Sequence, residues 1–147
     1  MPTYQVYVNQ NKLTFQQKKA VATAITEGHC AQTGAPKYYV QVIINEIPDE
    51  NRFVCGQQFG KHMWIRGDVR CRTPEQNKNL MLELVGRVSE VCDYEKDFIW
   101  CDLCSIEPTN IVKFGTVFPP AGQEQAWYDA LPDQVKDVIQ ALLDGRA

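Results

Sequence analysis

Four short stretches of the chain are rich in residues that favour β-strands. Residues 3–9 (TYQVYVN) alternate apolar and polar side chains, as a strand with one buried face does. Residues 37–47 (KYYVQVIINEI) are almost all strand formers, and residues 63–70 (MWIRGDVR) and 97–103 (DFIWCDL) complete the set. The pattern predicts four strands.

Two stretches between these strands carry the period of an α-helix, residues 13–30 and residues 73–92. Apolar side chains four positions apart share one face of a helix. The predicted buried faces consist of Val21, Ile25 and His29 in the first helix and of Leu80, Leu84, Val88 and Val91 in the second.

Both predicted helices begin with a capping signal. Thr14 can accept from the first turn, and Gln17, three residues later, completes a capping box. Thr73 and Gln76 repeat the arrangement, with Pro74 in the first turn where no N–H is needed. The starts of both helices are therefore predicted closely.

Strand, helix and strand follow one another twice, which predicts an α/β (α+β) protein of tandem β-α-β units. A crossover helix makes the strands of each unit parallel, with a right-handed connection. Side by side, the units give a four-stranded sheet with both helices on one face. We expect one domain over 1–147, with halves at 1–50 and 60–105 and a C-terminal extension ending in an amphipathic tail helix. The bare second face and open edges favour oligomerisation.

Composition is ordinary for a soluble globular protein, with 147 residues, 44% hydrophobic and 22% charged, and a net charge of −3. Because no long run of one sign occurs, neither nucleic acid nor a membrane is expected as a partner. No basic segment followed by an apolar run marks a signal peptide. No apolar stretch nears the roughly 20 residues that span a bilayer. A cytoplasmic location is expected.

Six cysteines are present, and two of them form the motif CDLC at Cys101 and Cys104. No second pair or nearby histidine completes a zinc set. In a strand, the two thiols would face opposite sides. Buried structural thiols are therefore preferred over a metal or redox site.

The order of elements behind an opening Met-Pro resembles the tautomerase superfamily, and within it most closely the cis-3-chloroacrylic acid dehalogenase group. The resemblance rests on MPTYQVYV at the start, AITEGH in the first helix, APKYYVQVIINE in the second strand and GQEQAWYDALP in the tail. It runs over almost the whole chain. The resemblance implies a β-α-β fold, a homotrimer whose sheets pack together, and an amino-terminal proline in a small pocket.

The same resemblance implies site residues. Pro2 matches the catalytic proline, and His29 matches the substrate-binding histidine at a helix end. Arg70 matches the first of two carboxylate-binding arginines. Arg72 matches the second, although the family spaces the pair Arg-x-x-Arg and this chain has RCR. The resemblance implies no cofactor and no metal.

Two positions depart from the family pattern. Asp102 stands where the family has a tyrosine, and Lys113 where it has a glutamate before an aromatic-glycine pair. In the dehalogenases these two residues help to activate water, so their replacement argues against dehalogenation. Asp102 would orient a partner or repel an anionic substrate. Lys113 would be a third carboxylate ligand or simply solvated.

Pro2 becomes a secondary amine if Met1 is removed. Nearby arginines and partial burial both disfavour the cation and lower the pKa of such an amine. A neutral amine can move a proton between carbon and oxygen, or attack a carbonyl. The alternative is that a proline after Met has no role, and a retained Met1 would make Pro2 an amide that is no base.

Arg70 and Arg72 are two residues apart at a strand end, so they point the same way if the strand continues. Guanidinium groups bind carboxylates in bidentate fashion. The alternative is a solvated pair, with Arg66 on the same face as the reserve candidate. His29 is either a substrate ligand or a buried histidine satisfied by a carbonyl.

These expectations converge on a tautomerase- or isomerase-like enzyme that acts on a small 2-oxo acid or its enol. Pro2 would be the base, and His29, Arg70 and Arg72 would bind the substrate. One alternative is a hydratase, dehalogenase or decarboxylase of a three-carbon acid such as cis-3-chloroacrylate. Another is a non-catalytic trimeric binding protein.

Overall fold

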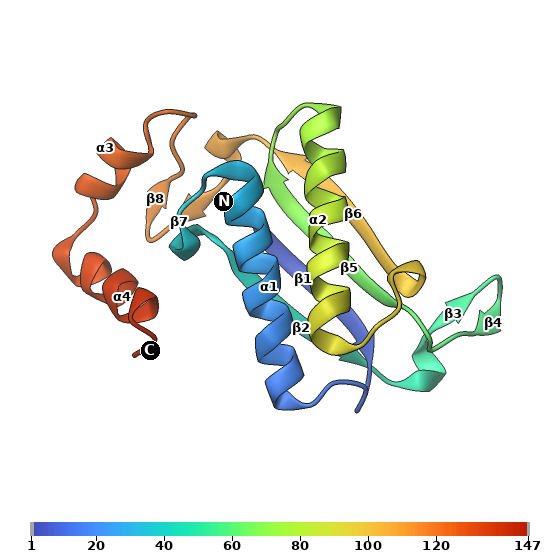
Figure 1. Ribbon diagram of the computed structural model, residues 1–147. Helices are drawn as coiled ribbons and strands as arrows, with labels where there is room; N and C mark the ends of the chain where they lie inside the picture. Colours follow the sequence, from blue (N-terminus) through green and yellow to red (C-terminus); the bar gives the residue numbers. More distant parts are fainter. Residues whose placement is uncertain (1, 147) are drawn as a thin grey trace.

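A four-stranded sheet with two long helices on one face forms the centre of the computed structural model, which describes residues 2–146 (Figure 1). The strand order is β2-β1-β5-β6. The elements are β1 (Thr3–Asn9), α1 (Phe15–Thr33), β2 (Gln41–Ile47), β5 (Met63–Arg70), α2 (Pro74–Cys92) and β6 (Ile99–Ile106).

Strand pairing follows from the two β-α-β units. β1 pairs in parallel with β2, and β5 pairs in parallel with β6. The units join through the two central strands, β1 and β5, which run antiparallel with Val6 opposite Ile65. The start of β1 and the end of β5 therefore lie at the same end of the sheet. The predicted α/β (α+β) arrangement, with both helices on one face, is confirmed.

Both helices begin at the predicted caps. The Thr14 side chain accepts from the Gln17 backbone N–H, and Thr73 accepts from Gln76 in the same way. Each glutamine side chain returns a bond to the backbone of its cap, which completes the box. The first helix runs to Thr33, three residues beyond its predicted end.

The core lies between the sheet and the helices. Its strand residues are the inward-facing members of the alternating patterns in β1 and β5, and its helix residues lie four apart. Burying each such side chain contributes roughly 1.5–3 kcal/mol. The prediction of Val91 as core is wrong, because Val91 is 39% exposed and Cys92 continues the four-residue spacing instead. The fully buried members include Tyr4, Val6, Val8, Val21, Ile25, Met63, Ile65, Val69, Leu80, Leu84 and Val88.

The second predicted strand begins later than expected. Lys37–Tyr39 forms a turn of 3-10 helix, closed by a hydrogen bond from the Val40 N–H to the Lys37 carbonyl. The Tyr39 ring packs edge-on against Phe118 of the tail. Tertiary packing of an aromatic side chain thus overrides its strand propensity. A similar turn at Lys96–Phe98 precedes β6, which runs from Ile99 to Ile106 instead of over 97–103.

The tail folds back beside the first unit, next to the turn at Lys37–Tyr39 (Figure 1). Phe118, Leu131 and Ile139 are its buried anchors. The predicted amphipathic helix is present, and a hairpin and a short helix precede it. The tail elements are β7 (Val112–Lys113), β8 (Thr116–Val117), α3 (Glu124–Asp129) and α4 (Asp133–Leu143). Elsewhere, a second hairpin is formed by β3 (Phe53–Val54) and β4 (Gln57–Gln58), and short 3-10 turns lie at Asp49–Asn51 and Pro108–Asn110.

The sheet face away from the helices carries polar and aromatic side chains. Tyr7 stacks on Trp64 with ring centroids 4.9 Å apart, and the Trp64 indole N–H donates to Asp102. Ile43 and Trp100 are 40% and 44% exposed. This face is the bare surface that the sequence predicts.

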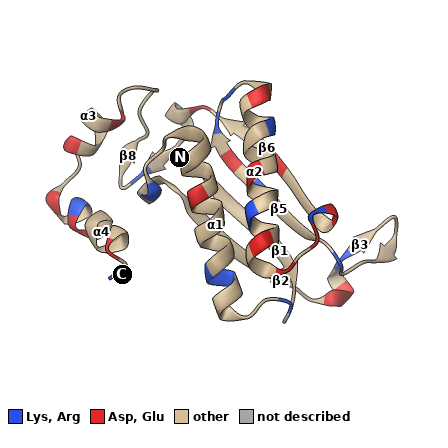
Figure 2. Cartoon of the chain, viewed as in Figure 1, with Lys and Arg blue, Asp and Glu red and all other residues tan. Residues whose placement is uncertain are grey.

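Basic and acidic residues are interspersed along the long helices and the tail, whereas β1 carries neither (Figure 2). A basic stretch marks the junction between β5 and α2, where Arg70 and Arg72 lie. Within residues 2–146, no helix is both long and apolar enough to cross a membrane.

Candidate active site

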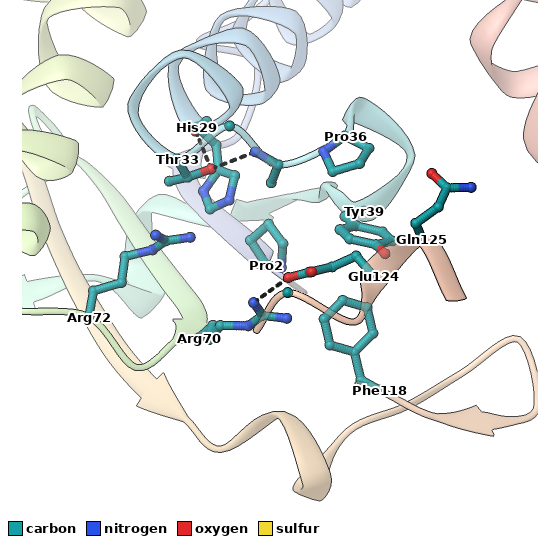
Figure 3. Close-up of a pocket in the computed structure, with 13 residues that line it drawn as sticks. Pro2, His29, Thr33, Pro36, Tyr39, Arg70, Arg72, Phe118, Glu124 and Gln125 are labelled. Carbon is teal, nitrogen blue, oxygen red and sulfur yellow. Dashed lines mark hydrogen bonds and ion pairs between the residues drawn. The ribbon is translucent and has the colours of Figure 1, made fainter. Parts of the chain in front are cut away.

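A cavity of about 430 Å³ opens where the start of β1, the end of α1 and the end of β5 meet. The turn at Lys37–Tyr39 and the tail segment 118–125 close its other side. Four predicted site residues line it together: Pro2, His29, Arg70 and Arg72 (Figure 3). The antiparallel pairing of β1 with β5 places them there, because it brings Pro2 to the end of the sheet that carries the arginines.

Pro2 is buried at the centre of the cavity, between His29 and Arg70 (Figure 3). Its carbonyl accepts a hydrogen bond from the Gln41 N–H at 3.1 Å. This bond ties Pro2 to β2. Met1, whose removal the sequence analysis left open, lies outside the described residues.

His29 occupies the last turns of α1, and its ring faces the cavity while only 1% of the residue is exposed. Its Nδ1 lies 2.7 Å from the Tyr4 hydroxyl. Burial, followed by the nearby positive charge of Arg72, lowers the pKa of His29 to about 4. Burial also raises the pKa of Tyr4 above its ordinary value. The pair is therefore a neutral imidazole beside a protonated phenol at physiological pH.

Arg70 has partners on every side. Its Nη1 donates to Glu124 Oε1 at 2.7 Å, and its Nη2 donates to the Pro119 carbonyl at 3.2 Å. The guanidinium also lies over the Phe118 ring, 5.4 Å from its centroid. Burial acts to raise the pKa of Glu124, but hydrogen bonds from Arg70 and from backbone amides outweigh it and lower that pKa. Glu124 is therefore ionised.

Arg72 has no such partners. It precedes the Thr73 cap of α2, and within residues 2–146 it forms no ion pair and its buried Nε has no hydrogen-bond acceptor. Burial, followed by the charge of Arg70, lowers the pKa of Arg72, which stays far above neutral for a guanidinium. A partly buried cation that forms no ion pair with the described residues favours the binding of an anion from outside the chain.

Three other candidates lie away from the cavity. Asp102 accepts the hydrogen bond from Trp64 on the bare sheet face. Arg66 lies on the same face as Arg70 but four residues earlier in β5, about 13 Å along the strand, and pairs with Asp68 at 3.7 Å. The structure thus places neither Arg66 nor Asp102 beside Pro2.

Lys113 is in the β7–β8 hairpin, where its Nζ donates to the carbonyls of Tyr38 and Tyr39 at 3.1 and 3.2 Å. Burial lowers its pKa to about 8. Its ammonium group therefore holds the hairpin against the back of the cavity wall and does not line the cavity itself.

Tyr39, Phe118 and Glu124 line the cavity but were not among the residues predicted from the sequence. The Tyr39 hydroxyl is buried without a hydrogen-bond partner, and burial raises its pKa. Glu124 lies in GQEQAWYDALP, one of the stretches that carry the family resemblance. The sequence signal that could have pointed to Glu124 is a carboxylate close to the aromatic residues Trp127 and Tyr128.

No group of three or more metal-ligating side chains occurs in the described part of the chain that could hold a metal ion. Cys101 packs against the core beneath the helices, whereas the Cys104 sulfur lies 3.6 Å from Arg66 Nη2 on the opposite face of β6. The chemical groups that line the cavity come from six residues. They are the Pro2 nitrogen, the His29 imidazole, the Tyr39 phenol, the guanidinium groups of Arg70 and Arg72, and the Glu124 carboxylate.

Comparison with known proteins gives a consistent result. Residues 1–130 match the family model described as "Putative oxalocrotonate tautomerase enzyme". A 2-hydroxymuconate tautomerase of Pseudomonas putida is 39% identical over 56 residues, which are 38% of this chain and 87% of that protein. The crystal structure of N1, a member of the cis-3-chloroacrylic acid dehalogenase family, is 27% identical, with a TM-score of 0.87 over 94% of this chain and 98% of that one.

A fused 4-OT described as an asymmetric trimer shares the fold. It is 21% identical, with a TM-score of 0.72 over 85% of this chain and 98% of that one.

Proposed function

Because the chain belongs to the oxalocrotonate tautomerase family, we propose that it is a tautomerase that interconverts small 2-oxo acids and their enols, with the Pro2 amine as base. The observation that carries the proposal is the convergence of Pro2, His29, Arg70 and Arg72 on one cavity of about 430 Å³. Such a cavity is of a size to enclose a small acid.

Pro2 moves a proton between oxygen and carbon. After removal of Met1 its nitrogen is a secondary amine, and burial beside two guanidinium groups keeps a fraction neutral near pH 7. The neutral amine takes the proton from the enol hydroxyl of the substrate and returns one to the neighbouring carbon, which leaves the 2-oxo acid. Substrate atoms and protons balance, and no cofactor takes part.

His29 is a neutral hydrogen-bond donor in this scheme. A protonated Tyr4 hydroxyl that donates to Nδ1 fixes the remaining proton on Nε2. That N–H is available to the oxygen on the second carbon of the substrate, where negative charge develops as the enol loses its proton. The positive end of the cavity at Arg70 and Arg72 attracts the substrate carboxylate, and Arg72 has the free guanidinium that can bind it.

Hydration or dehalogenation of a three-carbon acid is the second candidate, favoured by the Glu124 carboxylate in the cavity and by the likeness to a dehalogenase-family structure. Lys113 stands where the family has the glutamate that helps to activate water. In this chain, Glu124 would be the base that activates water instead. Its ion pair with Arg70 weakens it as a base. Chloride release from cis-3-chloroacrylate is therefore expected to be much slower than enol conversion.

A homotrimer is the proposed assembly. The bare sheet face carries exposed Ile43 and Trp100, and the buried Asn45 Nδ2 and Arg66 Nε have no hydrogen-bond acceptor within residues 2–146. Burial against other copies would cover the apolar side chains and supply those partners. Light scattering should give about three times the chain mass of 16.8 kDa; a monomer at micromolar concentration would contradict this.

Conversion of phenylenolpyruvate, followed by its ultraviolet absorbance, tests the function. The chain with Met1 removed should accelerate the reaction, and Pro2→Ala should reduce the rate sharply, because it replaces the constrained secondary amine by a primary one. Equal rates in the two chains would reject Pro2 as the base. No acceleration by either chain, with Met1 shown to be absent by intact mass, would favour the non-catalytic binding protein.

A further inference from the structure

The two arginines of the cavity differ in whether their charge is balanced. The Arg70 side chain, 19% exposed, lies 2.7 Å from the Glu124 carboxylate, whose side chain is 30% exposed. Because Nη2 and the flat face of the guanidinium are also occupied, by the Pro119 carbonyl and the Phe118 ring, Arg70 has little left to offer a ligand. Arg72 faces the same cavity with no carboxylate of the described chain beside it.

With Pro2 as the neutral amine, the formal charges of the described residues around the cavity leave a single unbalanced cation, Arg72. Arg70 and Glu124 cancel each other, and His29 is neutral above its lowered pKa. Lys113 donates to carbonyls behind Tyr39 and does not line the cavity. Arg72 can balance the charge of one substrate carboxylate. A second carboxylate on the same substrate would be repelled by Glu124, and no free cation would remain to balance its charge.

We propose that Glu124 determines the charge selectivity of this site, so that the cavity binds small monocarboxylates in preference to dicarboxylates, with Arg72 as the carboxylate anchor. The proposal deepens the tautomerase function and rests on it for the identity of the site. It assigns Arg70 to a new task, which is to hold Glu124 and the tail segment 118–125 as the far wall of the cavity.

The chemistry of that far wall agrees with an uncharged second end of the ligand. Tyr39 lines this wall, and its phenol is uncharged because burial raises its pKa. Phe118 offers an aromatic surface beside it, with ring centroids 4.9 Å apart. A monocarboxylate with a carbonyl, hydroxyl or apolar second end therefore fits both halves of the cavity.

Binding of two acids of equal chain length tests the proposal without requiring turnover. The probes are 2-oxopentanoate and 2-oxoglutarate, which differ by the second carboxylate, titrated by calorimetry at low salt. The unaltered chain should bind 2-oxopentanoate at least about tenfold more tightly. Glu124→Gln keeps the shape and a hydrogen-bond acceptor for Arg70 but removes the charge, and should shift the affinity ratio at least about tenfold towards 2-oxoglutarate.

Two further variants serve as controls. Glu124→Asp keeps the negative charge and should retain the preference for 2-oxopentanoate. Glu107→Gln removes one charge near the same end of the sheet, at an exposed residue that pairs with Cys71 outside the cavity. It should leave both affinities unchanged.

Two outcomes would overturn the proposal. The first is an unaltered chain that binds 2-oxoglutarate as tightly as 2-oxopentanoate. The second is a folded Glu124→Gln chain, checked by its thermal unfolding, with an unchanged affinity ratio. Failure of the tautomerase function looks different: the binding preference would appear as expected, while enol conversion would be absent or independent of Pro2.

Discussion

The two ends of the sheet are built from equivalent parts but handle their polar groups differently. At one end, the start of β1, the end of β5 and the end of α1 surround a cavity with Pro2, Arg72 and His29. At the other end, the start of β5 and the end of β1 bring together His62, Asn9 and Arg52. Each end thus buries one histidine beside an arginine, and Arg52 is fully buried whereas Arg72 is only partly buried.

Partners distinguish the two ends. Arg52, 6% exposed, donates to the Asn9 side chain at 3.0 Å and to the Tyr7 carbonyl at 3.4 Å. The His62 ring stacks on Phe59 and packs at a tilt against Trp100. Arg72 lies beside a cavity with its Nε unsatisfied. Burial of a cation does not by itself mark a functional site, because the fully buried Arg52 is satisfied by acceptors of the chain. Arg72 differs because it faces a cavity and its buried Nε lacks an acceptor among the described residues.

The histidines give the largest expected contrast, in the pH dependence of stability. The pKa of His29 is lowered from 6.5 to about 4 in the folded chain, so the unfolded chain takes up this proton first as the pH falls. The free energy of unfolding should therefore fall by up to about 3 kcal/mol between pH 6.5 and pH 4 from this group.

Urea unfolding at several pH values measures this effect. His29→Gln should remove most of it, whereas His62→Gln, at a site where burial and then Arg52 also lower the pKa, should remove less. An identical pH dependence in the His29→Gln chain would show that His29 is not buried in neutral form.

The arginines give the next contrast, in catalysis. Arg72→Ala should lower kcat/KM for phenylenolpyruvate by tenfold to a hundredfold, corresponding to about 1.5–3 kcal/mol for a charged hydrogen bond, mainly through KM. Steady-state kinetics measures the effect. Unchanged kinetics would place carboxylate recognition elsewhere in the cavity, with Arg70 as the next residue to test.

The matched substitution at the opposite end of the sheet should affect stability and not catalysis. Arg52→Ala should lower the free energy of unfolding by about 1–2 kcal/mol, because it removes two buried hydrogen bonds, and should leave kcat/KM unchanged. Chemical unfolding and the same kinetic assay measure the two quantities. A large loss of kcat/KM with intact stability would mean that the two ends are coupled.

Local signals made most of the fold predictable from the sequence. Thr14 and Thr73 mark helix starts through their own hydrogen bonds, and alternation in residues 3–9 and 63–70 defines the buried face of each central strand. Tyr39 shows where such signals end. Its β-propensity predicts a strand, but its packing against Phe118, 79 residues along the chain, decides its conformation.

The site was predictable to the extent that it lies on the β-α-β units. Pro2, His29, Arg70 and Arg72 were placed through the resemblance and through the strand and helix ends, and they meet at one cavity. Glu124 could not be placed, because its position depends on how the tail folds back over the end of β5. No local pattern encodes that contact.

The state of the amino terminus tests the central claim most directly. We would compare the chain with Met1 removed, verified by intact mass, with a chain that keeps one residue before Pro2, using phenylenolpyruvate as substrate. The added residue turns the Pro2 nitrogen into an amide, so kcat/KM should fall at least about a hundredfold while the oligomeric state persists. Equal kcat/KM in the two chains would contradict the account, since an amide nitrogen cannot act as the base.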